Sequence, residues 1–255
     1  MSKRKRFVIV SFLLTLGLLG IQVVGIDQRY EAIIFFSGVS IILSAWALLS
    51  DLKGIEWLTV LSLPAVYPAS VALFYFLLPE SIISKIILLG LFGFGMYALL
   101  LTENIYSVAA IRTIQLLRAA HAVGFLITIL TAIFLTGTLL SLRQDFWINA
   151  IGVGLIIFIL LVQGLWSATL SPRLPRSIIA VSAALSIMAG ILTAAMGFLP
   201  ITPLVSSFLI SGYLYVVLGL MQHELQGRLF AKTVQEYLTV ATMVLAAAAY
   251  VTFKR

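Results

Sequence analysis

The amino-acid sequence predicts an all-α integral membrane protein, a polytopic bundle of eight or nine transmembrane helices joined by short loops. The first observation behind this prediction is composition: of 255 residues, 62% are hydrophobic and 10% are charged, with a mean hydropathy of +1.16. A soluble domain carries about 25% charged residues, because water must cover its surface. Soluble enzymes, nucleic-acid-binding proteins and disordered tails are therefore excluded.

The other two observations are the length and the continuity of the apolar runs. A helix needs about 20 apolar residues to cross about 30 Å of hydrocarbon. Transmembrane β-strands instead alternate every second residue over about 10 residues, and the runs here do not alternate. Helices are predicted, since a helix satisfies its backbone hydrogen bonds within one segment. The predicted spans are 7–25, 32–49, 57–77, 86–101, 119–140, 146–168, 178–199, 204–221 and 238–253.

The first apolar run resembles a signal peptide, and the last apolar run is short for a membrane crossing. The run at 7–25 follows four basic residues and has 19 residues. The apolar core of a signal peptide has about 7–15 residues, so we expect a retained span. The run at 238–253 has 16 residues, which is short for a crossing. Whether it crosses stays open, and with it the choice between eight and nine spans.

Basic residues orient the chain. With the N-terminus in the cytoplasm, 11 of the 16 Lys and Arg residues lie in cytoplasmic segments and 5 in outer segments; the numbers are 13 and 3 if the last run does not cross. Basic loops tend to stay in the cytoplasm. We therefore expect a cytoplasmic N-terminus in the plasma (inner) membrane, with anionic lipid headgroups as partners at the cytoplasmic face. Tryptophan prefers the headgroup level, and each tryptophan lies near a predicted span end: Trp46, Trp57, Trp147 and Trp166.

The connections between spans are too short for a soluble domain, so residues 1–255 are expected to form a single transmembrane domain. Long connections after the fourth and eighth spans suggest two four-helix halves, 1–118 and 119–237, followed by a C-terminal helix at 238–253.

The two longest connections are 102–118 and 222–237. In the second, charged residues recur at every fourth position from Glu224 to Glu236, and Phe230 lies on the other side. This pattern predicts an amphipathic helix at the membrane surface. It would link two spans or offer a docking surface to a cytoplasmic protein.

Small residues recur at four-residue spacing in the seventh span: Ser182, Ser186, Gly190 and Ala194. Such a ladder lets another helix backbone approach closely. We interpret it as a helix-packing surface, with the contact either inside the chain or in a homo-oligomer.

The third span contains Pro64 and Pro68, each of which removes a backbone donor and bends the helix. Broken helices near mid-membrane often hold the substrate in transporters. The candidate substrate-binding residues are therefore Pro64, Tyr67, Pro68 and the mid-membrane Tyr213. The alternative is a structural kink whose released carbonyls are satisfied by hydroxyls such as those of Ser62 and Tyr67.

A second candidate group lies near the cytoplasmic boundary: Glu103, His121, His223 and Glu224. Two histidines and a carboxylate can bind a divalent metal. However, the chain has no cysteine, two histidines and no Glu-x-x-His or His-Glu-x-x-His motif. We therefore predict a polar cluster at the interface, with no metal, no cofactor and no catalytic residue assigned.

Charged residues are also missing from the central half of every predicted span. Proton pumps, voltage sensors and many ion-coupled carriers need such residues in the bilayer. Three functions remain. The first is a non-catalytic membrane subunit or scaffold that binds a protein partner. The second is a carrier or channel for a neutral, apolar or lipid-like solute, and the third is an intramembrane enzyme at the cytoplasmic interface.

Overall fold

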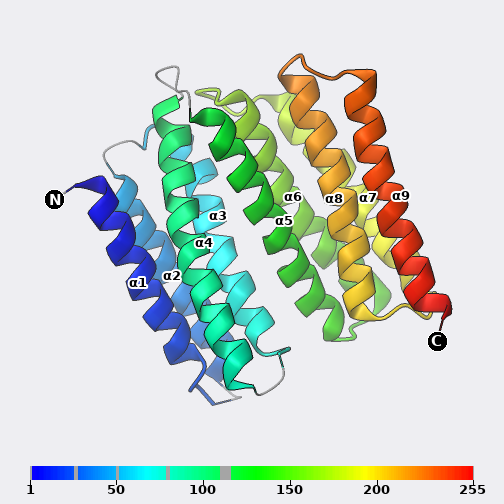
Figure 1. The fold of residues 1–255 in the computed structure, drawn as a ribbon, viewed down its shortest axis with the longest axis horizontal. Helices are drawn as coiled ribbons and strands as arrows, with labels where there is room; N and C mark the ends of the chain where they lie inside the picture. Colours follow the sequence, from blue (N-terminus) through cyan, green and yellow to red (C-terminus); the bar gives the residue numbers. More distant parts are fainter. Residues whose placement is uncertain (1, 26–27, 50–51, 79–80, 110–115, 255) are drawn as a thin grey trace. The chain divides into compact units, whose positions relative to one another are not determined.

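A computed structural model describes residues 2–25, 28–49, 52–78, 81–109 and 116–254. Over these residues the chain forms nine α-helices and no β-strand, which confirms the predicted fold class (Figure 1). The helices are α1 (Lys3–Ile21), α2 (Arg29–Leu48), α3 (Glu56–Tyr75), α4 (Ile82–Ala109), α5 (Leu117–Ser141), α6 (Phe146–Thr169), α7 (Arg176–Met196), α8 (Pro203–Leu225) and α9 (Ala231–Phe253). Among the described helices, the eight from α2 to α9 are long and apolar enough to cross a membrane, as in a multi-pass integral membrane protein.

Of the described helices, α4 and α9 exceed the apolar runs that predicted them by the most residues. α4 continues through Glu103 to Ala109, so the first part of the predicted connection 102–118 is helical; residues 110–115 of it lie outside the described residues. α9 begins at Ala231 and has 23 residues. Its length suffices for a crossing, which the shorter run 238–253 left open.

The predicted amphipathic helix at 222–237 is wrong, because a turn divides this segment between α8 and α9. Gly227 has a left-handed backbone conformation with φ of +64°. Its N–H donates to the carbonyl oxygen of Glu224 at 2.9 Å, and the N–H of Arg228 donates to that of His223 at 2.8 Å. This pair of hydrogen bonds ends a helix at a glycine. Glu224 therefore belongs to α8, Lys232 and Glu236 belong to α9, and Arg228 lies in the connection between them.

The chain forms two compact units, Met1–Thr131 and Ala132–Arg255, whose boundary lies within α5. In the first unit, α1 and α3 each pack against both α2 and α4, so these four helices close into a bundle. Phe92 of α4 lies in its core, with its ring centroid 6.2 Å from that of Phe36 and 5.6 Å from that of Tyr67.

In the second unit, α6, α7 and α8 contact one another, and α9 packs against α8. Small residues allow the neighbouring helices of this unit to approach each other closely. A Cβ atom placed on Gly190 of α7 would lie 2.9 Å from the carbonyl oxygen of Ala150 in α6. On α8, Gly219 and Gly212 receive the side chains of Tyr237 and Val244 from α9. Every residue of α9 is described, and none is buried.

The tryptophans differ in their surroundings. Trp46, Trp57 and Trp147 are exposed by 44, 46 and 53%, as expected for side chains at the headgroup level. Trp166 is fully buried in the second unit, where its Nε1 donates to the carbonyl oxygen of Ser171 at 3.0 Å. Its position near the end of α6 thus reflects packing inside the protein rather than contact with headgroups.

Candidate functional site

The proline pair lies in α3 of the first unit, where Pro64, Tyr67 and Pro68 are all buried. Tyr67 is 4% exposed, and its ring stacks on Phe92. On another side, its hydroxyl lies against Gly95 of α4, so closely that a Cβ there would overlap it. Packed side chains thus surround the tyrosine that the sequence suggested as a substrate contact.

The carbonyl that Pro68 leaves without a backbone donor is also used. Pro68 has no N–H to offer the carbonyl of Pro64, and the Ser40 hydroxyl of α2 donates to that oxygen at 2.7 Å. The hydroxyl of Ser62, which was predicted to satisfy a released carbonyl, instead donates to the carbonyl of Thr59 at 2.8 Å. The prediction for Ser62 is therefore wrong. The hydroxyl that satisfies the Pro64 carbonyl therefore comes from the neighbouring helix α2.

The four residues of the predicted polar cluster divide between the two units. In the first, Glu103 is fully buried in the last third of α4. The ring centroid of His121 in α5 lies 5.5 Å from that of Tyr106. Tyr106 follows Glu103 by one helical turn, and its hydroxyl donates to the carbonyl of Ala120 at 3.0 Å.

In the second unit, His223 Nδ1 lies 2.8 Å from the carbonyl oxygen of Gly219, and its ring meets Tyr237 edge-on at 5.7 Å. Glu224 is exposed. Among the residues that the structure describes, no three His, Asp or Glu side chains lie together in a way that could hold a metal ion.

The small-residue ladder lies in α7, with Ser182, Ser186 and Gly190 buried. Gly190 faces the backbone of α6 as described above. Toward the outside, Ser186, Gly190 and Ala194 form one wall of a shallow furrow of about 400 Å³ between α6 and α7.

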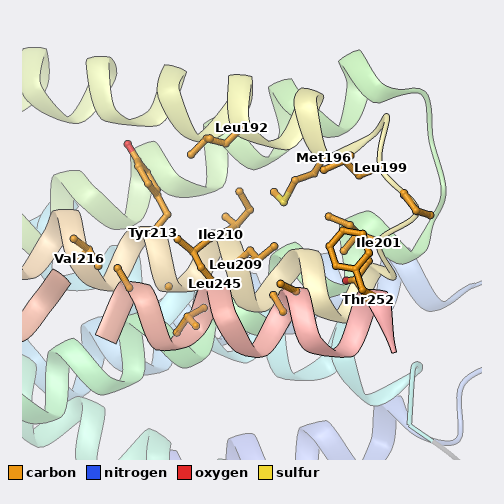
Figure 2. A pocket seen from close by; sticks show the side chains of 17 residues that line it. Leu192, Met196, Leu199, Ile201, Leu209, Ile210, Tyr213, Val216, Leu245 and Thr252 are labelled. Atoms are coloured by element: carbon orange, nitrogen blue, oxygen red, sulfur yellow. The ribbon is translucent and has the colours of Figure 1, made fainter. Parts of the chain in front are cut away.

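A larger apolar groove lies between α7, α8 and α9, at a place that the sequence did not predict. Its volume is about 580 Å³, within the range of about 300–1,000 Å³ usual for ligand pockets. Figure 2 shows side chains from the three helices converging on this space. Tyr213 lines it, with its hydroxyl donating to the carbonyl of Leu185 at 2.8 Å. The ring is thus left as an apolar wall, and no charged side chain lines the groove.

One end of the groove meets a smaller cavity of about 340 Å³. The two cavities share four lining residues, Met196, Leu199, Pro200 and Ile201. The smaller cavity adds polar lining residues: Arg143, Asn149, Thr193, Thr202 and Ser206. An apolar channel therefore ends beside a cation and several hydrogen-bonding groups. We call the larger cavity the α7–α9 groove and the smaller cavity the polar end of this groove.

Arg143 is exposed and follows α5 in a left-handed conformation with φ of +51°. Its guanidinium makes no hydrogen bond or ion pair with another residue of the described ranges. Asn149 Nδ2 donates to the carbonyl of Gln144 at 3.0 Å. The Oδ1 atom of this amide is buried with no hydrogen-bond partner in the described part of the chain, although buried polar atoms are normally paired.

This arrangement can hold an amphiphile, with its hydrocarbon part among the apolar side chains and its polar part at Arg143. No protein-family profile, curated protein or solved structure matches the chain.

The sequence carried one usable signal for the groove. Small side chains on α8 and α9, Gly212, Ala241, Ala248 and Ala249, line it, and they leave the space that larger residues would fill. Nothing in the sequence indicates that α7, α8 and α9 share a surface. The small residues alone therefore could not show where a groove would form.

Proposed function

We propose that this chain is a non-catalytic, multi-pass membrane protein that binds a lipid-like amphiphile in the α7–α9 groove. The single observation that supports this function is the continuity of a charge-free groove of about 580 Å³ with a polar cavity that contains Arg143. A solute that is wholly polar would find no partner in the groove. A solute that is wholly apolar would leave the polar end unused.

The proposal includes the orientation expected from the distribution of basic residues. With the N-terminus in the cytoplasm of the plasma (inner) membrane and with α1 crossing as the first predicted span, the connections α5–α6 and α7–α8 lie on the outer side. The polar end of the groove, which these connections form, then lies at the level of the outer lipid headgroups.

The test is lipid retention. The chain is reconstituted in phosphatidylcholine vesicles, extracted in mild detergent and analysed by native mass spectrometry. Ala248 lines the groove and Ala247 does not, so Ala248→Phe is matched by Ala247→Phe. We expect wild type and Ala247→Phe to retain lipid and Ala248→Phe to lose most of it. Equal retention by the two variants would exclude the groove as the binding site.

A second candidate function is a membrane subunit that binds a partner helix. The furrow between α6 and α7 favours it, because Gly154, Ser186 and Gly190 are small residues on its wall and small residues admit a second helix. Cross-linking from a photoreactive residue at Ile187, which lines the furrow and is 63% exposed, tests it. Adducts with a stoichiometric partner support a subunit, and adducts with lipid alone exclude it.

A further inference from the structure

The polar end of the α7–α9 groove indicates which amphiphile binds. A hydrocarbon chain gains little by moving from the bilayer into an apolar groove, because lipid tails are as apolar as the side chains that line it. The groove by itself can select shape but not lipid class. Selection among lipids must therefore arise at the polar end.

The charge at that end favours an anion. Arg143 lines the polar cavity, and its guanidinium has no ion-pair partner in the described part of the chain. Guanidinium groups bind phosphate through paired, charge-assisted hydrogen bonds. One acidic residue, Asp145, lies in the same connection, but it lines neither cavity.

Neighbouring groups match the rest of a headgroup. Asn149 lines the cavity beside Arg143, and its Oδ1 atom lacks a hydrogen-bond donor among the described residues. The χ2 torsion of asparagine is soft, so rotation of the Asn149 amide would let this acceptor meet a ligand hydroxyl in the cavity. Ser206, whose hydroxyl bonds no other described residue, adds a group that can donate or accept. A phosphate that carries a hydroxyl-bearing substituent satisfies all three side chains.

We infer that the α7–α9 groove binds an anionic phospholipid, with the phosphate at Arg143, a headgroup hydroxyl at Asn149 and one acyl chain along α9. This inference rests on the proposed function, since it names the class of lipid that the same groove takes. Phosphatidylglycerol is the simplest lipid with this chemistry. Phosphatidylcholine carries no net charge and no headgroup hydroxyl.

The experiment uses the full chain in vesicles that contain equal amounts of phosphatidylglycerol and phosphatidylcholine. After extraction in mild detergent, native mass spectrometry measures the ratio of the two lipids bound. We expect about tenfold enrichment of phosphatidylglycerol, the factor that one charge-assisted hydrogen bond supports. Arg143→Gln should reduce the ratio to near one with total lipid retained, whereas Arg143→Lys should keep part of the enrichment. Arg173→Gln removes an equal charge from the connection before α7, away from the groove, and should change nothing.

The outcomes separate the two proposals. If Ala248→Phe abolishes retention of both lipids but wild type shows no enrichment, the groove binds lipid and the anionic class is wrong. If enrichment survives in Arg143→Gln, the phosphate does not bind at Arg143 and the assigned site is overturned. If Arg173→Gln lowers the ratio as much as Arg143→Gln, enrichment reflects the overall positive charge and the Arg143 site is overturned. Retention that Ala248→Phe leaves unchanged overturns the groove itself.

Discussion

The hydroxyl of Ser40 in α2 donates a 2.7 Å hydrogen bond to the carbonyl oxygen of Pro64 in α3, the acceptor that Pro68 leaves free. A proline inside a transmembrane helix leaves an unpaired carbonyl where water cannot reach it. The neighbouring helix supplies the missing donor here. The carbonyl that Pro68 leaves free thus joins α3 to α2 through a hydrogen bond.

Ser40→Ala should lower the free energy of unfolding by about 1 kcal/mol, the usual size of a hydrogen bond between membrane helices. Ser37→Ala is the matched control. Ser37 donates to the carbonyl of Ala65 at 2.8 Å, an oxygen that can also accept the backbone N–H four residues later in α3. The loss should therefore be smaller, as measured by equilibrium unfolding in mixed detergent micelles.

The hydrogen bond between Ser40 and Pro64 can also be tested in the background of a second substitution, at Pro68. Pro68→Ala restores an N–H that can reach the Pro64 carbonyl, so Ser40→Ala should cost less in that background than in wild type. Equal costs in the two backgrounds would mean that Ser40 stabilises the bundle in another way.

Gly190→Ala should destabilise the second unit by about 1–3 kcal/mol, the range of overpacking substitutions. The reason is that the new methyl group would lie 2.9 Å from the Ala150 carbonyl oxygen, so α6 and α7 must separate. Gly38→Ala in α2 is the control, because nothing lies within 4 Å of a Cβ at that position. It should be neutral or stabilising, since alanine favours helix. Thermal unfolding of both variants in detergent measures the contrast.

Arg143→Gly should remove the preference for anionic lipid without lowering the free energy of unfolding. The left-handed conformation of Arg143 costs roughly 1–2 kcal/mol for a residue with a side chain, and glycine adopts it freely. We expect the free energy of unfolding to stay the same or rise by up to about 1 kcal/mol, after the entropy of glycine in the unfolded chain is counted. Phosphatidylglycerol enrichment should be lost. Leu170→Gly, at another left-handed position with φ of +48°, relieves similar strain and should keep the enrichment.

The sequence predicted the helices well because their signal is local. An apolar run of membrane length has few alternatives to a spanning helix. The ends of the helices were predicted less well where charged residues do not coincide with a helix end. Glu103 interrupts the apolar run, yet α4 continues through it, since burial inside the protein removes the carboxylate from lipid. At Gly227 the opposite error arose, because periodic charges hid a glycine that ends a helix.

The candidate site could not be predicted, because it belongs to no single segment. Tyr213 was singled out for its depth, and the structure places it in the groove, but its partners come from α7 and α9. Arg143 was counted only as one loop charge among 16 basic residues. What distinguishes it is its position at the end of a cavity, and contacts between distant helices decide that position.

Because the sequence has no cysteine, single cysteines can report the orientation without background. Gln144→Cys and Lys254→Cys, both at exposed positions, should react in intact cells with a membrane-impermeant maleimide. Arg173→Cys, also exposed, should react only after the membrane is opened. Labelling at 173 with protection at 144 would invert the topology, and protection at 254 with labelling at 144 would mean that α9 does not cross.

The absence of buried side chains in α9 has a practical consequence. The trio α6, α7 and α8 makes its own mutual contacts, and α9 packs against α8, through partly exposed side chains such as Tyr237 and Val244. A reporter domain fused after residue 254 is therefore tolerated by the scaffold behind it. Because α9 forms one side of the groove, separation of α9 from α8 would open the groove toward the bilayer and admit from the side the lipid tail that we propose.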